Sequence, residues 1–188
     1  MGLARTDRMV REFTAEAEWV PFELHPEIPA QGYERDERRP LMKPEVREYL
    51  AAEAQQAGLP FQGSPLIANS HNALAASEWA RDQGSDAYDK LHHAIFTAYF
   101  GEARNISTVD QVVAIAGEQG LDGAGLRAHL ERGAHSATVT ESTARMREHG
   151  ITSTPTFLFG DRYMMMGAQD FETFASVLGR LGVPRRDR

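Results

Sequence analysis

Cysteine is absent from all 188 residues of the chain. Without cysteine the chain has no disulfide, no thiolate ligand for zinc and no thiol nucleophile. No apolar run approaches the roughly 18 residues that a membrane-spanning helix needs. The 20 Lys and Arg residues are outnumbered by 27 Asp and Glu residues, and the net charge of −7 lacks the clustered positive charge that binds phosphate backbones. We therefore expect no disulfide exchange by these residues alone, and neither a membrane nor a nucleic acid as partner.

The rest of the composition is typical of a folded globular protein. Hydrophobic residues make up 41% of the chain and charged residues 25%, both close to the average of globular domains. At 188 residues the chain is long enough for one domain of ordinary size, or for one core with an inserted subdomain.

The first forty residues predict a helix, a strand and a loop. Residues 3–17 place Met9 and Phe13 on one stripe of an amphipathic helix. The segment EWVPFEL, residues 18–24, is rich in aromatic and branched side chains and predicts a short strand. Pro21 removes one ladder donor, which indicates an edge strand. Residues 25–40 are a proline-bearing loop that ends in the charged stretch ERDERRP, which is typical of solvated surface.

Helical patterns then fill residues 43–149. The start and stop signals include Pro44 in a first turn, Ser70 and Asp86 near two N-termini, and a capping box formed by Ser107 and Asp110. Two further helices are predicted at residues 122–131 and 136–149. This block is predicted to be all helical.

After Gly150 the pattern returns to strand. TPTFLF and RYMMM flank the pair Gly160 and Asp161, which predicts a hairpin with a two-residue type II′ turn. Asp170 is a good N-cap for a last amphipathic helix.

The order of the elements is that of a thioredoxin-type core lacking its first strand. The segment ITSTPTFLFGDRYMMMGAQDFETFASVL resembles the cis-proline end of the DsbA family, in particular its FrnE-like branch. Further segments resemble the same branch, namely WVPFELHPEIPAQG, SHNALAASEWA, AYFGEARNIS and AGEQGLD. The predicted fold is therefore α/β, with a thioredoxin-like core over residues 1–40 and 150–188 and an all-helical insertion over residues 41–149.

The resemblance implies a thiol–disulfide oxidoreductase that uses a Cys-x-x-Cys at the start of the first helix. GLARTDRMVREF resembles that helix just past the second cysteine, so we expect the first strand and both thiols upstream of Met1. No catalytic residue is then predicted within the chain. Loss of a central strand leaves backbone N–H and C=O groups at the neighbouring sheet edges without partners. Each such group that is buried costs about 1–3 kcal/mol of stability. We expect another segment, or a second copy in a homodimer, to fill that gap.

Thr154 and Pro155 are the predicted substrate-binding residues. The resemblance implies a cis peptide bond between them, with the Thr154 backbone pairing to an extended thiol-containing peptide or protein as an added strand. The alternative is an ordinary trans proline that opens a strand. The three methionines at 164–166 could line a soft peptide groove, but alternation between core and surface is favoured.

The histidines do not predict a metal site. His92 and His93 are adjacent in a helical pattern and point apart, and His129, His135 and His149 fall on separate elements without HExxH spacing. Neither a metal nor a cofactor is predicted.

Two alternative functions stay open. Glutathione-dependent isomerases and kappa-class transferases resemble this architecture, and they hold glutathione with a serine near the end of the first strand. A non-catalytic module that binds or holds extended peptides is the second. The segments PFELHPEIPAQG and TSTPTF look more like the FrnE-like branch and favour the oxidoreductase. The resemblance and the lack of an apolar leader in the given residues predict a cytoplasmic location.

Overall fold

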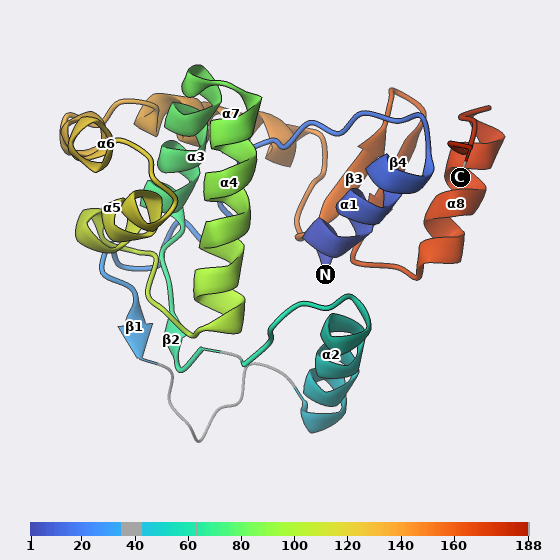
Figure 1. Cartoon of the computed structure of the whole chain (residues 1–188), viewed down its shortest axis with the longest axis horizontal. Helices are drawn as coiled ribbons and strands as arrows, with labels where there is room; N and C mark the ends of the chain where they lie inside the picture. Colours follow the sequence, from blue (N-terminus) through green and yellow to red (C-terminus); the bar gives the residue numbers. More distant parts are fainter. Residues whose placement is uncertain (35–42, 63, 188) are drawn as a thin grey trace. The chain divides into compact units, whose positions relative to one another are not determined.

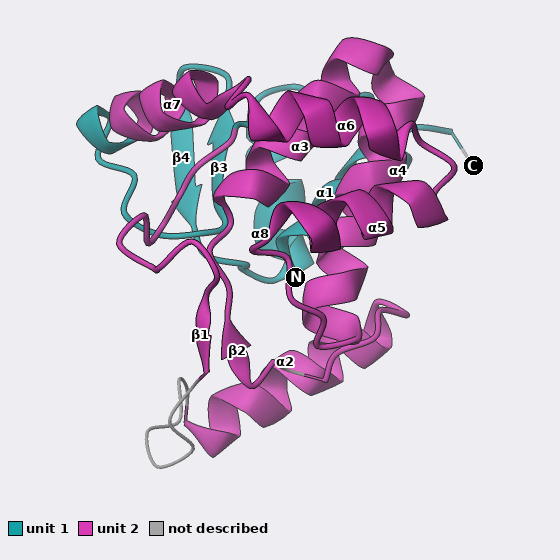
Figure 2. Ribbon diagram, turned by 90° about the vertical axis from the view of Figure 1, so that its left-hand side faces the viewer, with its two compact units in different colours: residues 1–20, 147–188 teal, residues 21–146 magenta. Residues whose placement is uncertain are grey.

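The computed structural model describes residues 1–34, 43–62 and 64–187 (Figure 1). The chain forms two compact units, one from residues 1–20 and 147–188 and the other from residues 21–146 (Figure 2). We call them the terminal unit and the helical unit. The terminal unit takes both ends of the chain, whereas the helical unit is one continuous stretch. Residues 21–34 lie in the helical unit, whereas the sequence places them in the predicted core.

The terminal unit consists of a hairpin and two helices. These are α1 (Gly2–Glu12), β3 (Thr156–Phe159), β4 (Tyr163–Met166) and α8 (Phe171–Arg180). The strands are antiparallel, with Thr156 opposite Met166 and Phe159 opposite Tyr163. The buried core consists of Met9, Phe13, Phe159, Phe171, Phe174 and Leu178. Asp170 accepts the N–H of Thr173, which confirms the predicted N-cap of the last helix.

Helix α1 is shorter than predicted because its end pairs with the C-terminal segment. Phe13 is extended and forms an isolated antiparallel bridge with Arg185. The N–H of Thr14 donates to the Pro184 carbonyl at 2.9 Å, and that of Arg186 donates to the Glu12 carbonyl at 2.9 Å. This pairing takes the place of a further helical turn.

The strand predicted at residues 18–24 is wrong. These residues form no regular structure, and no strand of the described chain runs beside them. The N–H of Glu23 instead donates to the Thr143 hydroxyl on a helix, at 2.9 Å. Strand propensity was present, but without a neighbouring strand there is no ladder to complete.

The hairpin turn also differs from the prediction. Pairing of Phe159 with Tyr163 leaves three residues in the loop rather than two. Gly160 has φ +58°, a left-handed conformation that glycine adopts without steric cost.

The helical unit confirms the helical pattern of residues 43–149. Its elements are α2 (Pro44–Gln56), α3 (His71–Gln83), α4 (Ser85–Phe96), the π-helix η1 (Thr97–Gly101), α5 (Val109–Glu118), α6 (Gly123–Glu131) and most of α7 (Ser136–Glu148). Its core is separate from that of the terminal unit and includes Ala76, Leu91, Val112, Leu126 and Val139.

Two local features differ from the prediction. The capping pair lies one residue later, where Thr108 donates to Gln111 at 2.8 Å. Ser107 is fully buried, and its hydroxyl accepts the N–H of Asn69 at 3.0 Å instead of capping the helix. A pair of two-residue strands, β1 (Tyr33–Glu34) and β2 (Leu66–Ile67), was not predicted.

Most of the charged stretch predicted as solvated surface, residues 35–40, lies outside the described residues. Among the helices that are described, none combines the length and apolar character needed to cross a bilayer.

Candidate functional site

The start of α1 lies directly against Pro155. A Cβ atom built on Gly2 would be 2.9 Å from Cβ and 3.2 Å from Cγ of the proline ring. A side chain at this position would therefore force α1 and the proline apart. Sequence reasoning did not single out Gly2, although a glycine in a first helical turn is a recognisable signal of close approach.

The predicted substrate-binding residues lie in the loop that opens β3. The peptide bond between Thr154 and Pro155 is cis. The Pro155 carbonyl accepts the N–H of Gly167 at 2.8 Å, and the Thr156 hydroxyl donates to the Ser153 carbonyl at 2.8 Å. Thr154 itself is exposed. The hairpin thus fixes the loop while leaving Thr154 accessible to a ligand.

The helix gives this loop an electropositive neighbour. The first N–H groups of an α-helix have no intrahelical acceptor, and the helix dipole places partial positive charge there. Arg5 donates to the Gln169 carbonyl at 2.9 Å, which ties α1 to the segment before α8. Anionic groups, including a thiolate, are stabilised at such a position. The chain supplies no thiol for it.

One face of the hairpin is apolar and exposed. Leu158, Met164 and Met166 are 51%, 47% and 46% exposed, and the strand register places Leu158 opposite Met164. Phe157 lies on the opposite face, where its ring meets that of Phe174 edge to face at 4.7 Å. The methionines at 164–166 alternate between surface and core, as favoured from the sequence.

The second edge of β3 completes the candidate site. Within the described residues β3 pairs only with β4, so its other edge has no strand beside it. An open strand edge presents N–H and C=O groups that an extended chain can pair with. Thr154 and Pro155 directly precede β3 in the chain. Pro155 also contacts the start of α1, so the open edge, the loop and the helix start lie together.

His92, His129 and His135 belong to the helical unit. His92 is buried on α4, with ring centroids 5.2 Å from Tyr88 and 4.9 Å from Phe96. Burial, together with the charges of His93 and Arg81, lowers the pKa of His92 to about 4.

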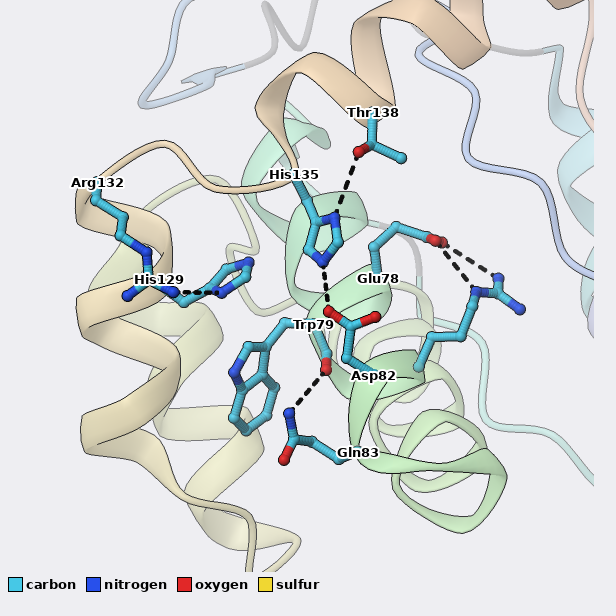
Figure 3. A network of polar contacts seen from close by, with 9 residues as sticks. Glu78, Trp79, Asp82, Gln83, His129, Arg132, His135 and Thr138 are labelled. Carbon is cyan, nitrogen blue, oxygen red and sulfur yellow. Dashed lines mark hydrogen bonds and ion pairs between the residues drawn. The ribbon is translucent and has the colours of Figure 1, made fainter.

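His129 and His135 come together elsewhere in the helical unit. Their ring centroids are 4.9 Å apart (Figure 3). Burial, followed by the charge of His135, lowers the pKa of His129. Among the residues with described positions, no three His, Asp or Glu side chains are placed to hold a metal ion.

A cavity of about 500 Å³ opens in the helical unit beside α4 and α5. Its lining includes Arg104 and Glu118, which form two contacts of 2.7 and 2.8 Å. The bond from Arg104 lowers the pKa of Glu118. Asp89, Lys90 and Glu102 also line the cavity, so its wall carries charges of both signs.

The chain has detectable relatives among known proteins. The profile of the DSBA-like thioredoxin domain family matches residues 1–179. The chain is 26% identical over 183 residues to "Uncharacterized protein YwbO" of Bacillus subtilis (strain 168), which covers 95% of this chain and 88% of that protein.

Two solved structures share the fold. A probable DsbA oxidoreductase from Streptomyces coelicolor has a TM-score of 0.82 at 22% identity, covering 95% of this chain and 82% of its own. A 2-hydroxychromene-2-carboxylate isomerase has a TM-score of 0.62 at 21% identity, covering 73% of this chain and 66% of its own. At these identities both structures bear on the fold alone.

Proposed function

Because the chain belongs to the family of DSBA-like thioredoxin domains, we propose that it binds an extended segment of a thiol-containing protein in the course of thiol–disulfide exchange. The observation that carries the proposal is the contact between the start of α1 and Pro155, beside the exposed Thr154 and the open edge of β3.

The substrate binds as an added strand. The backbone of Thr154 pairs with the substrate backbone, which gives affinity without regard to the substrate's side chains. Met164, Met166 and Leu158 offer exposed, adaptable apolar contacts on the same hairpin. Such a surface accepts many sequences, as a general oxidoreductase requires.

The redox chemistry needs a pair of thiols from outside these 188 residues, because the chain has no cysteine. In exchange, a thiolate attacks a substrate disulfide, a mixed disulfide forms and one substrate thiolate leaves. The start of α1 stabilises a thiolate placed beside Pro155. Assignment to the FrnE-like branch and a cytoplasmic location are part of this proposal, and cell fractionation tests the location.

Peptide binding is tested with a matched pair of variants. The probe is a fluorescein-labelled extended peptide with apolar residues around a carboxamidomethylated cysteine. Thr154→Lys and Asp161→Lys place an exposed lysine before and after β3. The net charge rises by one in the first variant and by two in the second, so a purely electrostatic effect would be larger in the control. We expect Thr154→Lys to weaken binding at least about fivefold, because a charged side chain replaces a small one where the peptide docks. Asp161→Lys should leave the affinity unchanged.

Hydrogen exchange of the native protein provides the second readout. Pairing with the peptide should slow exchange of the backbone amides of Thr154 and Thr156, since Pro155 carries no N–H. If the peptide binds both variants equally, or protects only amides of the helical unit, the proposed binding mode is wrong.

The redox part is tested separately by translating the DNA upstream of the Met1 codon in frame. A Cys-x-x-Cys there supports disulfide exchange, whereas a serine in place of the first cysteine supports a glutathione-dependent isomerase. A stop codon leaves a peptide-binding or holdase function. Sedimentation of the purified chain shows whether a second copy occupies the edge of β3 as a homodimer.

A further inference from the structure

A serine, a histidine and a glutamate of the helical unit contact one another in a row, through one hydrogen bond and one ion-pair contact. The Ser136 hydroxyl oxygen lies 2.8 Å from Nε2 of His71. Nδ1 of the same ring lies 3.1 Å from Oε2 of Glu23. The three residues come from separate parts of the chain, since Ser136 opens α7, His71 opens α3 and Glu23 lies in the irregular segment between α1 and β1.

The contact with Glu23 selects one tautomer of the neutral imidazole. A carboxylate can only accept a hydrogen bond, so Nδ1 of His71 carries the proton that faces Glu23. In the neutral ring the lone pair is then on Nε2, which accepts the Ser136 hydroxyl. This is the arrangement in which a histidine removes a proton from a serine nucleophile.

The exposed fraction of the three side chains differs along the row. The Glu23 side chain is 8% exposed and the His71 side chain 29% exposed, while Ser136 is half-buried. The carboxylate is thus shielded and orients the ring, whereas the other two groups are reachable from solvent.

Neighbouring bonds hold the histidine and the glutamate in place. The Asn69 side chain accepts the N–H of His71 at 2.8 Å and donates to the Ile28 carbonyl at 2.7 Å. Thr143 on α7 accepts the N–H of Glu23 at 2.9 Å. A constellation positioned by such contacts needs little reorganisation during a reaction.

The start of α7 supplies the remaining requirement. Backbone N–H groups after Ser136 lie in the first turn, where an α-helix leaves donors without intrahelical acceptors. Such donors stabilise the oxyanion that forms when a carbonyl is attacked. A second network steadies the same turn, because His135 contacts Asp82 at 2.8 Å and Thr138 at 3.3 Å (Figure 3).

We propose that Ser136 is a nucleophile for acyl transfer from carboxylic esters, with His71 as general base and Glu23 as the positioning residue. The Ser136 oxygen attacks the ester carbonyl carbon while its proton moves to Nε2 of His71. The bond to the leaving alkoxide breaks, and the alkoxide takes that proton to depart as an alcohol. Water then attacks the acyl-serine, again giving its proton to His71, and a carboxylic acid leaves as Ser136 is restored.

Labelling of the full chain tests the nucleophile. The probes are p-nitrophenyl acetate and a fluorophosphonate, with the modified residue located by peptide mass spectrometry. We expect both adducts on Ser136, and at least about a tenfold loss of labelling in Ser136→Ala and in His71→Gln. Adducts that map to other residues, or labelling of both variants that equals that of the native protein, would overturn the proposal.

The absence of cysteine allows a test that needs no substrate. Ser136→Cys introduces a unique thiol, whose alkylation by iodoacetamide reports how far the neighbouring base activates it. Ser85→Cys is the matched control, because Ser85 also opens a helix but is more exposed. We expect Ser136→Cys to react at least about tenfold faster at pH 7 than Ser85→Cys, and to lose that excess when His71→Gln is added. Equal rates would show that His71 does not activate this position. Because the tested residues lie outside the Thr154 site, this outcome is independent of the proposed function.

Discussion

At the scale of single residues, His92 makes the stability of the protein depend on pH. Its ring is 8% exposed and lies between two aromatic rings, and burial lowers its pKa from 6.5 to about 4. In the unfolded chain the ring takes up a proton near pH 6.5, whereas in the folded protein it stays neutral until about pH 4. Neutral His92 therefore contributes its full share to the free energy of unfolding above pH 6.5, and this contribution is lost as the pH falls toward 4.

Substitution of His92 by phenylalanine should remove this pH dependence. At about 1.4 kcal/mol per pKa unit, the native protein should lose about 3 kcal/mol between pH 6.5 and 4 because of this residue. His92→Phe should not show that loss. The measurement is urea unfolding at a series of pH values, with exposed His25→Phe as the control that keeps the native profile. Identical profiles for native protein and His92→Phe would contradict the assignment.

At this scale the sequence revealed the loop residues but not their contacts. Thr154 and Pro155 stand out because the resemblance rests on the segment that contains them, and their role in substrate binding stays a prediction. The row formed by Ser136, His71 and Glu23 was not predicted, because the serine and the histidine are 65 residues apart and meet only in the folded helical unit. No local spacing signals such a contact.

At the scale of elements, the close approach of α1 to the loop before β3 depends on Gly2. Gly2→Val should push the helix start from Pro155 and lower the free energy of unfolding by about 1–3 kcal/mol, the usual cost of overpacking. The same variant should weaken peptide binding, since the site is built on that contact. Chemical denaturation and the peptide titration are the measurements.

The matched control for this prediction is Gly179→Ala. Gly179 lies in α8, and a Cβ added there meets no atom within 4 Å. Alanine is the better helix former by about 1 kcal/mol, so this variant should be as stable as the native protein or more stable. If Gly2→Val were equally harmless, the start of α1 would not be held against Pro155.

The elements also show where sequence reasoning succeeds. Helices of the helical unit were predictable because their signals are local, namely apolar stripes, N-caps and terminal glycines. The strand predicted at residues 18–24 was wrong because a strand requires a distant partner that no local pattern reveals. For the same reason α1 was predicted too long, since Arg185 lies far along the chain from Phe13.

At the scale of the whole molecule, two separate cores predict separate responses to mutation. Phe174 is fully buried in the core of the terminal unit, and Leu126 is fully buried in that of the helical unit. Phe174→Ala should cost about 3–5 kcal/mol, and Leu126→Ala about 2–5 kcal/mol. These costs are large against a typical total of about 5–15 kcal/mol.

Hydrogen exchange measured by mass spectrometry distinguishes the two units. In Phe174→Ala we expect faster exchange mainly in α1 and α8, and in Leu126→Ala mainly in α3, α5 and α6. Uniform acceleration over the whole chain in both variants would show that the protein unfolds as one cooperative body. The thioredoxin-like fold was predicted from the order of the elements and the resemblance, and the sequence also divided the chain into a core and a helical insertion. It did not predict that residues 21–34 belong to the helical unit.

The division of the terminal unit between both ends of the chain also affects how the protein is made. A ribosome releases α1 before α8, and about 160 residues separate them, which takes on the order of 10–30 s at usual rates of synthesis. The helical unit is a continuous stretch and can fold in that interval. Until Phe171 and Phe174 have been synthesised, Met9 and Phe13 have no core to pack into. The nascent chain therefore exposes an apolar surface that chaperones can bind. Mutations that weaken the packing of α8 should therefore lengthen the time during which α1 is exposed to chaperones and to aggregation.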